Sequence, residues 1–168
     1  GQYKNFVEKY DLNGKKIIEI GCGAGEFLEL WKEFDVKAYG TEHKKELVQK
    51  ARQAGLSVEE DFPESSEHSF KDAPFAAFCS FNFLEHQPDP LGYLKAAAHN
   101  LEEGGYGLIT VPSFEYILEN KSFYEIIPDH IAYYTFESLE SALNLAGFEV
   151  LKKETINRDT LSFEVRKR

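Results

Sequence analysis

The clearest chemistry in this sequence comes from a glycine-rich loop near its amino end. Residues 15–20 form a short apolar run, which is followed directly by Gly21, Cys22, Gly23, Ala24 and Gly25. Glycine lets the backbone approach a ligand that any Cβ atom would keep away. A loop between a strand and the next helix lies at the carboxyl edge of a parallel sheet, where nucleotide-type ligands bind. The residues expected to contact such a ligand are Gly21, Cys22, Gly23 and Gly25.

Three carboxylates around this loop indicate which ligand it holds. Glu26 stands where the dinucleotide fingerprint G-x-G-x-x-G requires its third glycine, and a carboxylate there would repel a pyrophosphate. Glu19, just before the loop, could instead reach a cationic ligand. Glu42, at the end of the next strand, can accept hydrogen bonds from both hydroxyls of a ribose. Because such an acid also serves NAD, the choice of a cationic ligand depends on Glu19 and Glu26.

A second group of residues could move a proton. Residues 112–136 hold seven Phe and Tyr side chains beside Asp129 and His130. Histidine is suited to general base catalysis near neutral pH. An aromatic segment over the carboxyl edge of a sheet can wall a pocket and exclude water, although a share of these rings could equally be ordinary core.

The elements that must position these residues alternate along the chain. Apolar runs and periodicity predict seven strands, at 15–20, 36–41, 56–58, 75–81, 106–111, 148–151 and 161–165. Helical spacing predicts helices at about 27–34, 47–54, 91–101 and 139–146. Residues 59–74 are polar and predict a loop with at most a brief helix. Strands that alternate with helices imply an α/β fold of Rossmann type, with helices on both faces of a mostly parallel sheet that ends in an antiparallel hairpin.

The composition narrows the class of protein further. The 168 residues fit one domain, and 42% hydrophobic with 29% charged residues is typical of a soluble globular protein. The two cysteines, Cys22 and Cys79, suit neither a disulfide framework nor a metal site, so a cytoplasmic setting is the default expectation. The net charge of −10 disfavours nucleic acid as a partner. No apolar run is long enough to span a bilayer, so no membrane partner is expected either. Because the sequence starts at Gly1 and lacks methionine, we expect it to be trimmed or cut from a longer chain.

These features together resemble the class I S-adenosylmethionine-dependent methyltransferases, over nearly the whole chain. Residues 19–25 are similar to that family's first motif, and Glu42 to its ribose-binding acid. The resemblance implies that Asp61 binds the adenine amine and that Phe62 lies along the ring. His43 would then neighbour the ribose or the adenine, unless it is simply an exposed histidine at the start of a helix.

The resemblance also covers the segment after the fourth strand. Residues 81–86 resemble the stretch that flanks the methionine portion of the cofactor, which implies contacts from Asn82 and Phe83. Small RNA 3′-end methyltransferases use a similar Glu-His pair with further ligands to hold a metal, but Asn82 stands where the second glutamate is expected, so no metal is predicted. His86 would instead border the acceptor pocket or cap the next loop.

The segment 129–134 resembles that of sugar-nucleotide C-methyltransferases, where a Glu-His pair precedes an aromatic residue. The resemblance implies His130 as the base, with Asp129 in place of the glutamate and Tyr133 beside it. The zinc-binding cysteines and carboxyl-terminal domain of that group are absent from this sequence. A histidine followed by an aromatic residue also occurs at this place more widely in the superfamily, so packing against the next helix is the alternative role for His130.

The sequence therefore predicts a single methyltransferase domain over residues 1–168, with a substrate-pocket insertion at about 112–136. The expected cofactor is S-adenosylmethionine, which leaves as S-adenosylhomocysteine, and the expected acceptor is a small molecule, with a nucleotide-sugar or related metabolite as the refinement. Three alternatives remain: an NAD-binding Rossmann enzyme, an RNA methyltransferase and a non-catalytic cofactor-binding module.

Overall fold

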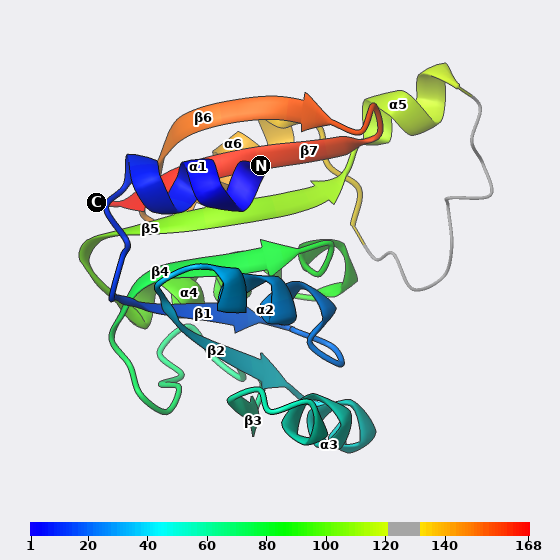
Figure 1. Ribbon diagram of the computed structural model, residues 1–168. Coiled ribbons are helices and arrows are strands. Elements are labelled where there is room, and N and C mark those ends of the chain that lie inside the picture. The colour runs from blue at the N-terminus through cyan, green and yellow to red at the C-terminus, as the bar shows by residue number, and fades with distance from the viewer. Residues whose placement is uncertain (121–131) are drawn as a thin grey trace.

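A seven-stranded sheet organises the chain in the computed structural model, which describes residues 1–120 and 132–168. The strand order is β3-β2-β1-β4-β5-β7-β6, and β7 runs antiparallel to both of its neighbours while the other pairs are parallel. The predicted fold class, a Rossmann-like sheet closed by an antiparallel hairpin, is confirmed. The arrowheads of β1, β2, β4 and β5 in Figure 1 point to one edge, so the residues that follow these strands meet there.

The elements have the following bounds. The strands are β1 Lys16–Ile20, β2 Lys37–Glu42, β3 Val58–Glu60, β4 Phe75–Phe81, β5 Leu101–Pro112, β6 Phe148–Ile156 and β7 Thr160–Lys167. The α-helices are α1 Gln2–Lys9, α2 Glu26–Leu30, α3 Lys45–Gln53, α4 Pro90–His99, α5 Phe114–Glu119 and α6 Phe136–Leu145. Two short 3₁₀ helices, η1 Trp31–Glu33 and η2 Leu84–His86, complete the set.

Helices cover both faces of the sheet and produce two apolar layers. Figure 1 shows α1 and α2 in front of the sheet and α4 and α6 behind it. The front layer packs Phe6 of α1 with Trp31 and Leu108. The rear layer packs Leu94 of α4 and Leu143 of α6 against the other face of the strands. Every residue of β4 is buried, as the continuous apolar run of a central parallel strand predicts.

The structure differs from the sequence prediction at several element boundaries. Leu101, predicted as the end of a helix, begins β5, because Asn100 ends α4 and the chain turns straight into the sheet. The third strand begins at Val58, and Leu56 packs in the front layer instead. The strand predicted at 148–151 extends to Ile156, since the polar turn at Asn157 and Arg158 comes only after it.

The amino-terminal helix α1 has no counterpart in the prediction. The helix has only eight residues, and two of them, Phe6 and Val7, are buried, which is too few to give a helical apolar pattern in the sequence. Its amino end contacts β7 through a hydrogen bond from Gln2 Nε2 to Ser162 Oγ. Lys9 Nζ donates to Glu164 Oε2 over 2.9 Å, so both ends of the helix are tied to the last strand.

Candidate active site

The glycine loop turns sharply between β1 and α2, and Gly21 shows why no side chain fits there. Its φ of +78° is a left-handed conformation, and an added Cβ would lie 2.5 Å from the ring of Phe83. Its amide N–H donates to the carbonyl of Thr41 over 3.0 Å. Gly21 therefore brings the loop backbone against β2 on one side and against the segment after β4 on the other.

Gly25 is required because Leu56 packs against it, and it does not line the ligand cavity. It precedes the first residue of α2 with a φ of +93°, and an added Cβ would lie 2.3 Å from Leu56 Cδ1. Cys22 is also buried, and a Cβ on Gly40 would lie 2.8 Å from its sulfur. Burial, with smaller contributions from Glu19 and other nearby carboxylates, raises the pKa of the Cys22 thiol, so this thiol is a packing group.

A cavity of about 620 Å³ opens above the loop at the carboxyl edge of the sheet. Its lining brings together residues from four separate stretches of the sequence. The lining residues are Gly21, Gly23, Glu42, His43, Lys44, Phe62, Asn82, Phe83, His86, Gln87 and Pro88. Eight of these were predicted as site residues from the sequence; Lys44, Gln87 and Pro88 were not, because nothing in their types or spacing marks them.

Glu42 is held rigidly at the end of β2. Its carboxylate is 4% exposed and accepts hydrogen bonds from the amide of Gly23 over 3.3 Å and from the amide of Lys44 over 2.6 Å. His43 Nδ1 lies 3.3 Å from Glu42 Oε2. Each carboxylate oxygen keeps a further lone pair, so the fixed carboxylate can still accept hydrogen bonds from a diol in the cavity.

Glu19 lies behind the loop and does not line the cavity. Its side chain is 2% exposed, and Oε1 has no hydrogen-bond partner among the described residues. Burial, and to a smaller extent the charge of Glu26, raises the pKa of Glu19 to about 8. A carboxyl group held in this way would be stabilised in its charged form by a nearby cation.

Phe62 continues the wall of the cavity just beyond the end of β3, whereas Asp61 lies beside it without lining the cavity. Asp61 Oδ1 accepts a hydrogen bond from the amide of Phe62 over 2.7 Å, and His68 Nε2 lies 2.8 Å from the same oxygen. The ring of Phe62 meets that of His43 edge-on at 5.6 Å between centroids. Phe62 and His43 thus form one aromatic side of the cavity, and Asp61 is oriented from behind by His68.

Glu85 and His86 occupy η2, directly after β4, on the other side of the cavity. His86 lines the cavity, while Glu85 is buried at 2% exposure. Tyr133 makes a ring contact with Phe114 of α5, at 5.6 Å between centroids. Asp129 and His130, the predicted supporting acid and base, lie outside the described residues. Within the described ranges, no group of three or more His, Cys, Asp and Glu side chains is arranged to hold a metal.

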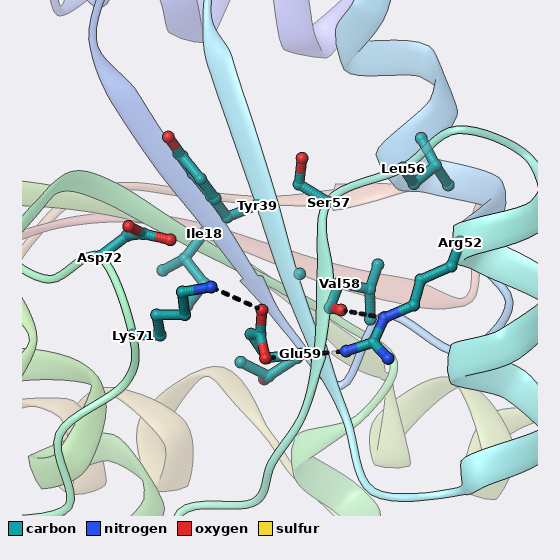
Figure 2. A pocket seen from close by; sticks show the side chains of 11 residues that line it. Ile18, Tyr39, Arg52, Leu56, Ser57, Val58, Glu59, Lys71 and Asp72 are labelled. Carbon is teal, nitrogen blue, oxygen red and sulfur yellow. Dashed lines mark hydrogen bonds and ion pairs between the residues drawn. The ribbon is translucent and has the colours of Figure 1, made fainter.

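A second cavity, of about 320 Å³, lies on the sheet between β2, β3 and residues 71–72, and none of the predicted site residues lines it. Figure 2 shows Lys71 and Arg52 approaching the carboxylate of Glu59 from opposite sides, at 3.4 and 3.7 Å. Arg52 Nε also donates to the carbonyl of Val58 over 2.8 Å. These contacts hold the short edge strand β3 in place.

The comparison with known families agrees with this geometry. Residues 2–153 match the model of a family described as a methyltransferase domain. The chain therefore belongs to the methyltransferase-domain family, and the predictions of this superfamily, of a methyltransferase and of S-adenosylmethionine as its cofactor are confirmed.

Individual proteins are similar to the chain either in sequence or in fold. It is 31% identical, over 102 residues, to a ubiquinone biosynthesis O-methyltransferase of Xanthomonas oryzae pv. oryzae, a match that covers 58% of this chain and 43% of that protein. An S-adenosylmethionine-dependent methyltransferase structure from Mesorhizobium loti superposes with a TM-score of 0.78 at 15% identity, covering 99% and 98% of the two chains. The [4+2]-cyclase SpnF superposes with a TM-score of 0.75 at 14% identity, covering 99% of this chain and 80% of that one.

The residues present fit S-adenosylmethionine. The cavity joins the glycine loop to the fixed carboxylate of Glu42, as a ribose requires. Behind the loop, Glu19 keeps a buried carboxyl oxygen without a partner among the described residues, as a ligand with cationic groups would favour. Within the part of the chain that the structure describes, no helix is long and apolar enough to cross a membrane.

Proposed function

We propose that the chain transfers the methyl group of S-adenosylmethionine to a small-molecule acceptor. The observation that carries the proposal is the 620 Å³ cavity, which combines the glycine loop with Glu42 in a chain of the methyltransferase-domain family. The bound cofactor supplies the methyl group on a positively charged sulfur. The task of the protein is then to align the acceptor with that methyl group and to keep water away.

Each wall of the cavity has a separate task in this proposal. Glu42 accepts the ribose hydroxyls, and Asp61 with Phe62 receives the adenine. Asn82 and Phe83 flank the methionine portion next to Gly21. His43 borders the ribose from the side of Glu42. The surface beneath the cofactor is formed by the loop residues Cys22, Gly23 and Gly25, and the carboxyl group of Glu19 lies behind them.

The acceptor side is proposed to come from residues 112–136 and the end of η2. The candidates for proton transfer are His130, Asp129, Tyr133 and His86. The related O-methyltransferases favour a hydroxyl group as acceptor, and the resemblance to sugar-nucleotide enzymes keeps a nucleotide-sugar among the candidate acceptors. The match spans less than half the length of the curated relatives, so their particular acceptor is not carried over to this chain.

Calorimetry with S-adenosylhomocysteine tests the cofactor site. The wild-type chain is expected to bind it, and Glu42→Ala is expected to weaken binding about tenfold or more, since charge-assisted hydrogen bonds to the ribose are lost. The matched control is Glu59→Ala, which removes an acid of the neighbouring strand that does not line this cavity. Equal affinity for the wild-type chain and Glu42→Ala would refute the ribose assignment. Binding of NADH in place of S-adenosylhomocysteine would refute the proposed function.

A further inference from the structure

The side chain of Glu85 is buried without the partners that a buried carboxyl group needs. It is 2% exposed, and its Oε2 has no hydrogen-bond partner among the described residues. Its Oε1 lies 3.7 Å from Nε2 of His86. Burying a polar atom without a hydrogen bond costs free energy, so its place at the carboxyl edge of β4 calls for a functional reason.

His86 connects this buried acid to the cavity. Its side chain is 36% exposed and lines the cavity that the cofactor is proposed to occupy. Its backbone is fixed, because its amide donates to the carbonyl of Phe83 over 3.0 Å. The imidazole thus lies between a buried carboxyl group on one side and the proposed site of methyl transfer on the other.

The surroundings of Glu85 keep its carboxyl group dry. The amide of Ala132 donates to the Glu85 carbonyl over 3.1 Å, which brings the returning end of the aromatic insertion against η2. Tyr134 from that segment is buried, with its hydroxyl unpartnered among the described residues, and Tyr93 approaches from α4. Burial, and then the charge of Glu85, raises the pKa of Tyr134 to about 12.

The electrostatics of the pair agree with this arrangement. Burial raises the pKa of Glu85 to about 7, while a hydrogen bond from its own backbone and the charge of His86 lower it. A positive charge on the imidazole therefore stabilises the carboxylate of Glu85. Among the described residues, Tyr134 and Tyr93 also face Glu85, and both are neutral near pH 7 because burial raises the pKa of each hydroxyl.

We propose that Glu85 is a positioning residue, which holds His86 as the base that receives the proton of a hydroxyl acceptor. The inference rests on the proposed methyl transfer and assigns the proton to His86 rather than to His130. The acceptor oxygen forms a bond to the methyl carbon, the bond from that carbon to sulfur breaks, and its electron pair stays on sulfur. The hydroxyl proton passes to Nδ1 of His86, whose Nε2–H faces Glu85. The separation of 3.7 Å between Nε2 and Oε1 is longer than a hydrogen bond, and the inference requires it to shorten to one in solution, with or without ligand.

Nuclear magnetic resonance of the imidazole N–H protons tests the pair without any acceptor. An imidazole N–H held by a buried carboxylate exchanges slowly and gives a low-field signal, whereas an unprotected one is lost by exchange with water. The wild-type chain saturated with S-adenosylhomocysteine is expected to show such a signal from Nε2 of His86. His68, whose Nε2 lies 2.8 Å from Asp61, provides the reference signal, assigned by its loss in Asp61→Asn.

Three variants decide the outcome. His86→Asn assigns the signal by removing it, and Glu85→Gln, which keeps the shape of the side chain but not its charge, is expected to move or abolish it. His130→Asn is expected to leave it unchanged. The reference signal of His68 shows in each variant that the fold is intact. Absence of a His86 signal in the wild-type chain, or an unchanged signal in a folded Glu85→Gln variant, would overturn the inference.

The ligand-free chain separates this inference from the proposed function. Failure of the wild-type chain to bind S-adenosylhomocysteine would count against the cofactor proposal alone, because the His86 signal can still be sought without ligand. A bound cofactor without the signal would count against the role of Glu85 alone. If Glu85→Gln does not fold, Glu85→Asp is used: its shorter side chain is expected to weaken the signal while the reference signal of His68 stays.

Discussion

Gly25 satisfies a backbone constraint and a packing constraint at the same position. Its φ of +93° disfavours any residue with a side chain, and Leu56 Cδ1 would lie 2.3 Å from an added Cβ. We expect Gly25→Ala to lower the free energy of unfolding by about 2–4 kcal/mol, because left-handed strain and overpacking add together. Urea unfolding measures this loss.

Gly14 offers the matched control for that substitution. Its φ of +75° is similar, but nothing lies within 4 Å of an added Cβ. Gly14→Ala should therefore cost only the backbone strain, about 1–2 kcal/mol. The difference between the two variants measures the contact with Leu56, and equal losses would show that Leu56 moves aside freely.

Glu19 is expected to make the ligand-free chain less stable as the pH rises. Burial and the charge of Glu26 raise its pKa from 4.5 to about 8, so between these pH values the folded chain binds more protons than the unfolded one. Stability contributed by the neutral carboxyl group is therefore present below about pH 4.5 and is lost as the pH rises through 8. The side chain of Glu19→Gln stays neutral. From pH 5 to pH 8.5 its free energy of unfolding should therefore rise relative to that of the wild-type chain by about a few kcal/mol.

Urea unfolding at several pH values measures that gain. Glu26→Gln is the control, since it removes the smaller of the two causes and should reduce the pH dependence only slightly. A wild-type chain and a Glu19→Gln variant whose stabilities run parallel over this range would show that Glu19 is charged in the fold at neutral pH.

The connection from β3 to β4 is stabilised by one side chain at the end of α4 rather than by a helix of its own. Asn100 Oδ1 accepts from the amide of Phe70 over 2.7 Å, and its Nδ2 donates to the carbonyls of His68 and Ala96 over 2.7 and 2.8 Å. Phe70 is thereby fixed in the rear layer of the core. We expect Asn100→Ala to cost about 2–4 kcal/mol, because it leaves a buried amide unpaired.

Thermal and urea unfolding of Asn100→Ala check this expectation. Ser69→Ala, in the same connection, removes only an exposed contact with His99 and should change stability by less than about 0.5 kcal/mol. A loss as small for Asn100→Ala would mean that the connection is held by the burial of Phe70 alone.

The elements that the sequence predicts well are those with a strong local signal. The apolar run 75–81 and the glycines after β1 identify the central strands and the loop without help from the rest of the chain. Leu101 shows the limit, since its helical spacing from Leu94 and Ala98 is real but the turn at Asn100 overrides it. Tertiary contacts determine where such elements end, and the periodicity of the sequence alone does not predict these contacts.

The candidate site was predictable to the same extent and for the same reason. Glycines and carboxylates at strand ends mark the cavity, because the topology brings strand ends together. Gly25 belongs to the motif, yet its packing against Leu56 depends on a residue thirty-one positions away in the sequence. The sequence indicates Glu85 only as half of a possible metal-binding pair with His86, since its burial and its unpartnered oxygen exist only in the folded chain.

The first helix and the last strand pack together across the front of the sheet. Tyr10 and Lys9 both donate to Glu164 Oε2, over 2.7 and 2.9 Å, and Figure 1 shows α1 lying along β7. Phe6 is fully buried beneath this contact. Hydrogen bonds thus tie the first helix to the last strand above the front layer of the core, so we expect the chain to unfold as one unit.

Phe6→Ala tests this coupling, and Trp31 reports on it. Trp31 is the only tryptophan, and its ring lies 4.8 Å from that of Tyr3 in α1, so its fluorescence follows the docking of that helix. We expect Phe6→Ala to cost about 3–5 kcal/mol and to shift the fluorescence and circular dichroism transitions together. The control is Phe27→Ala, whose ring is 42% exposed on α2 and should cost about 1 kcal/mol. A fluorescence transition that precedes the loss of dichroism in Phe6→Ala would show that α1 unfolds separately. The sheet would then be stable without the contact between α1 and β7.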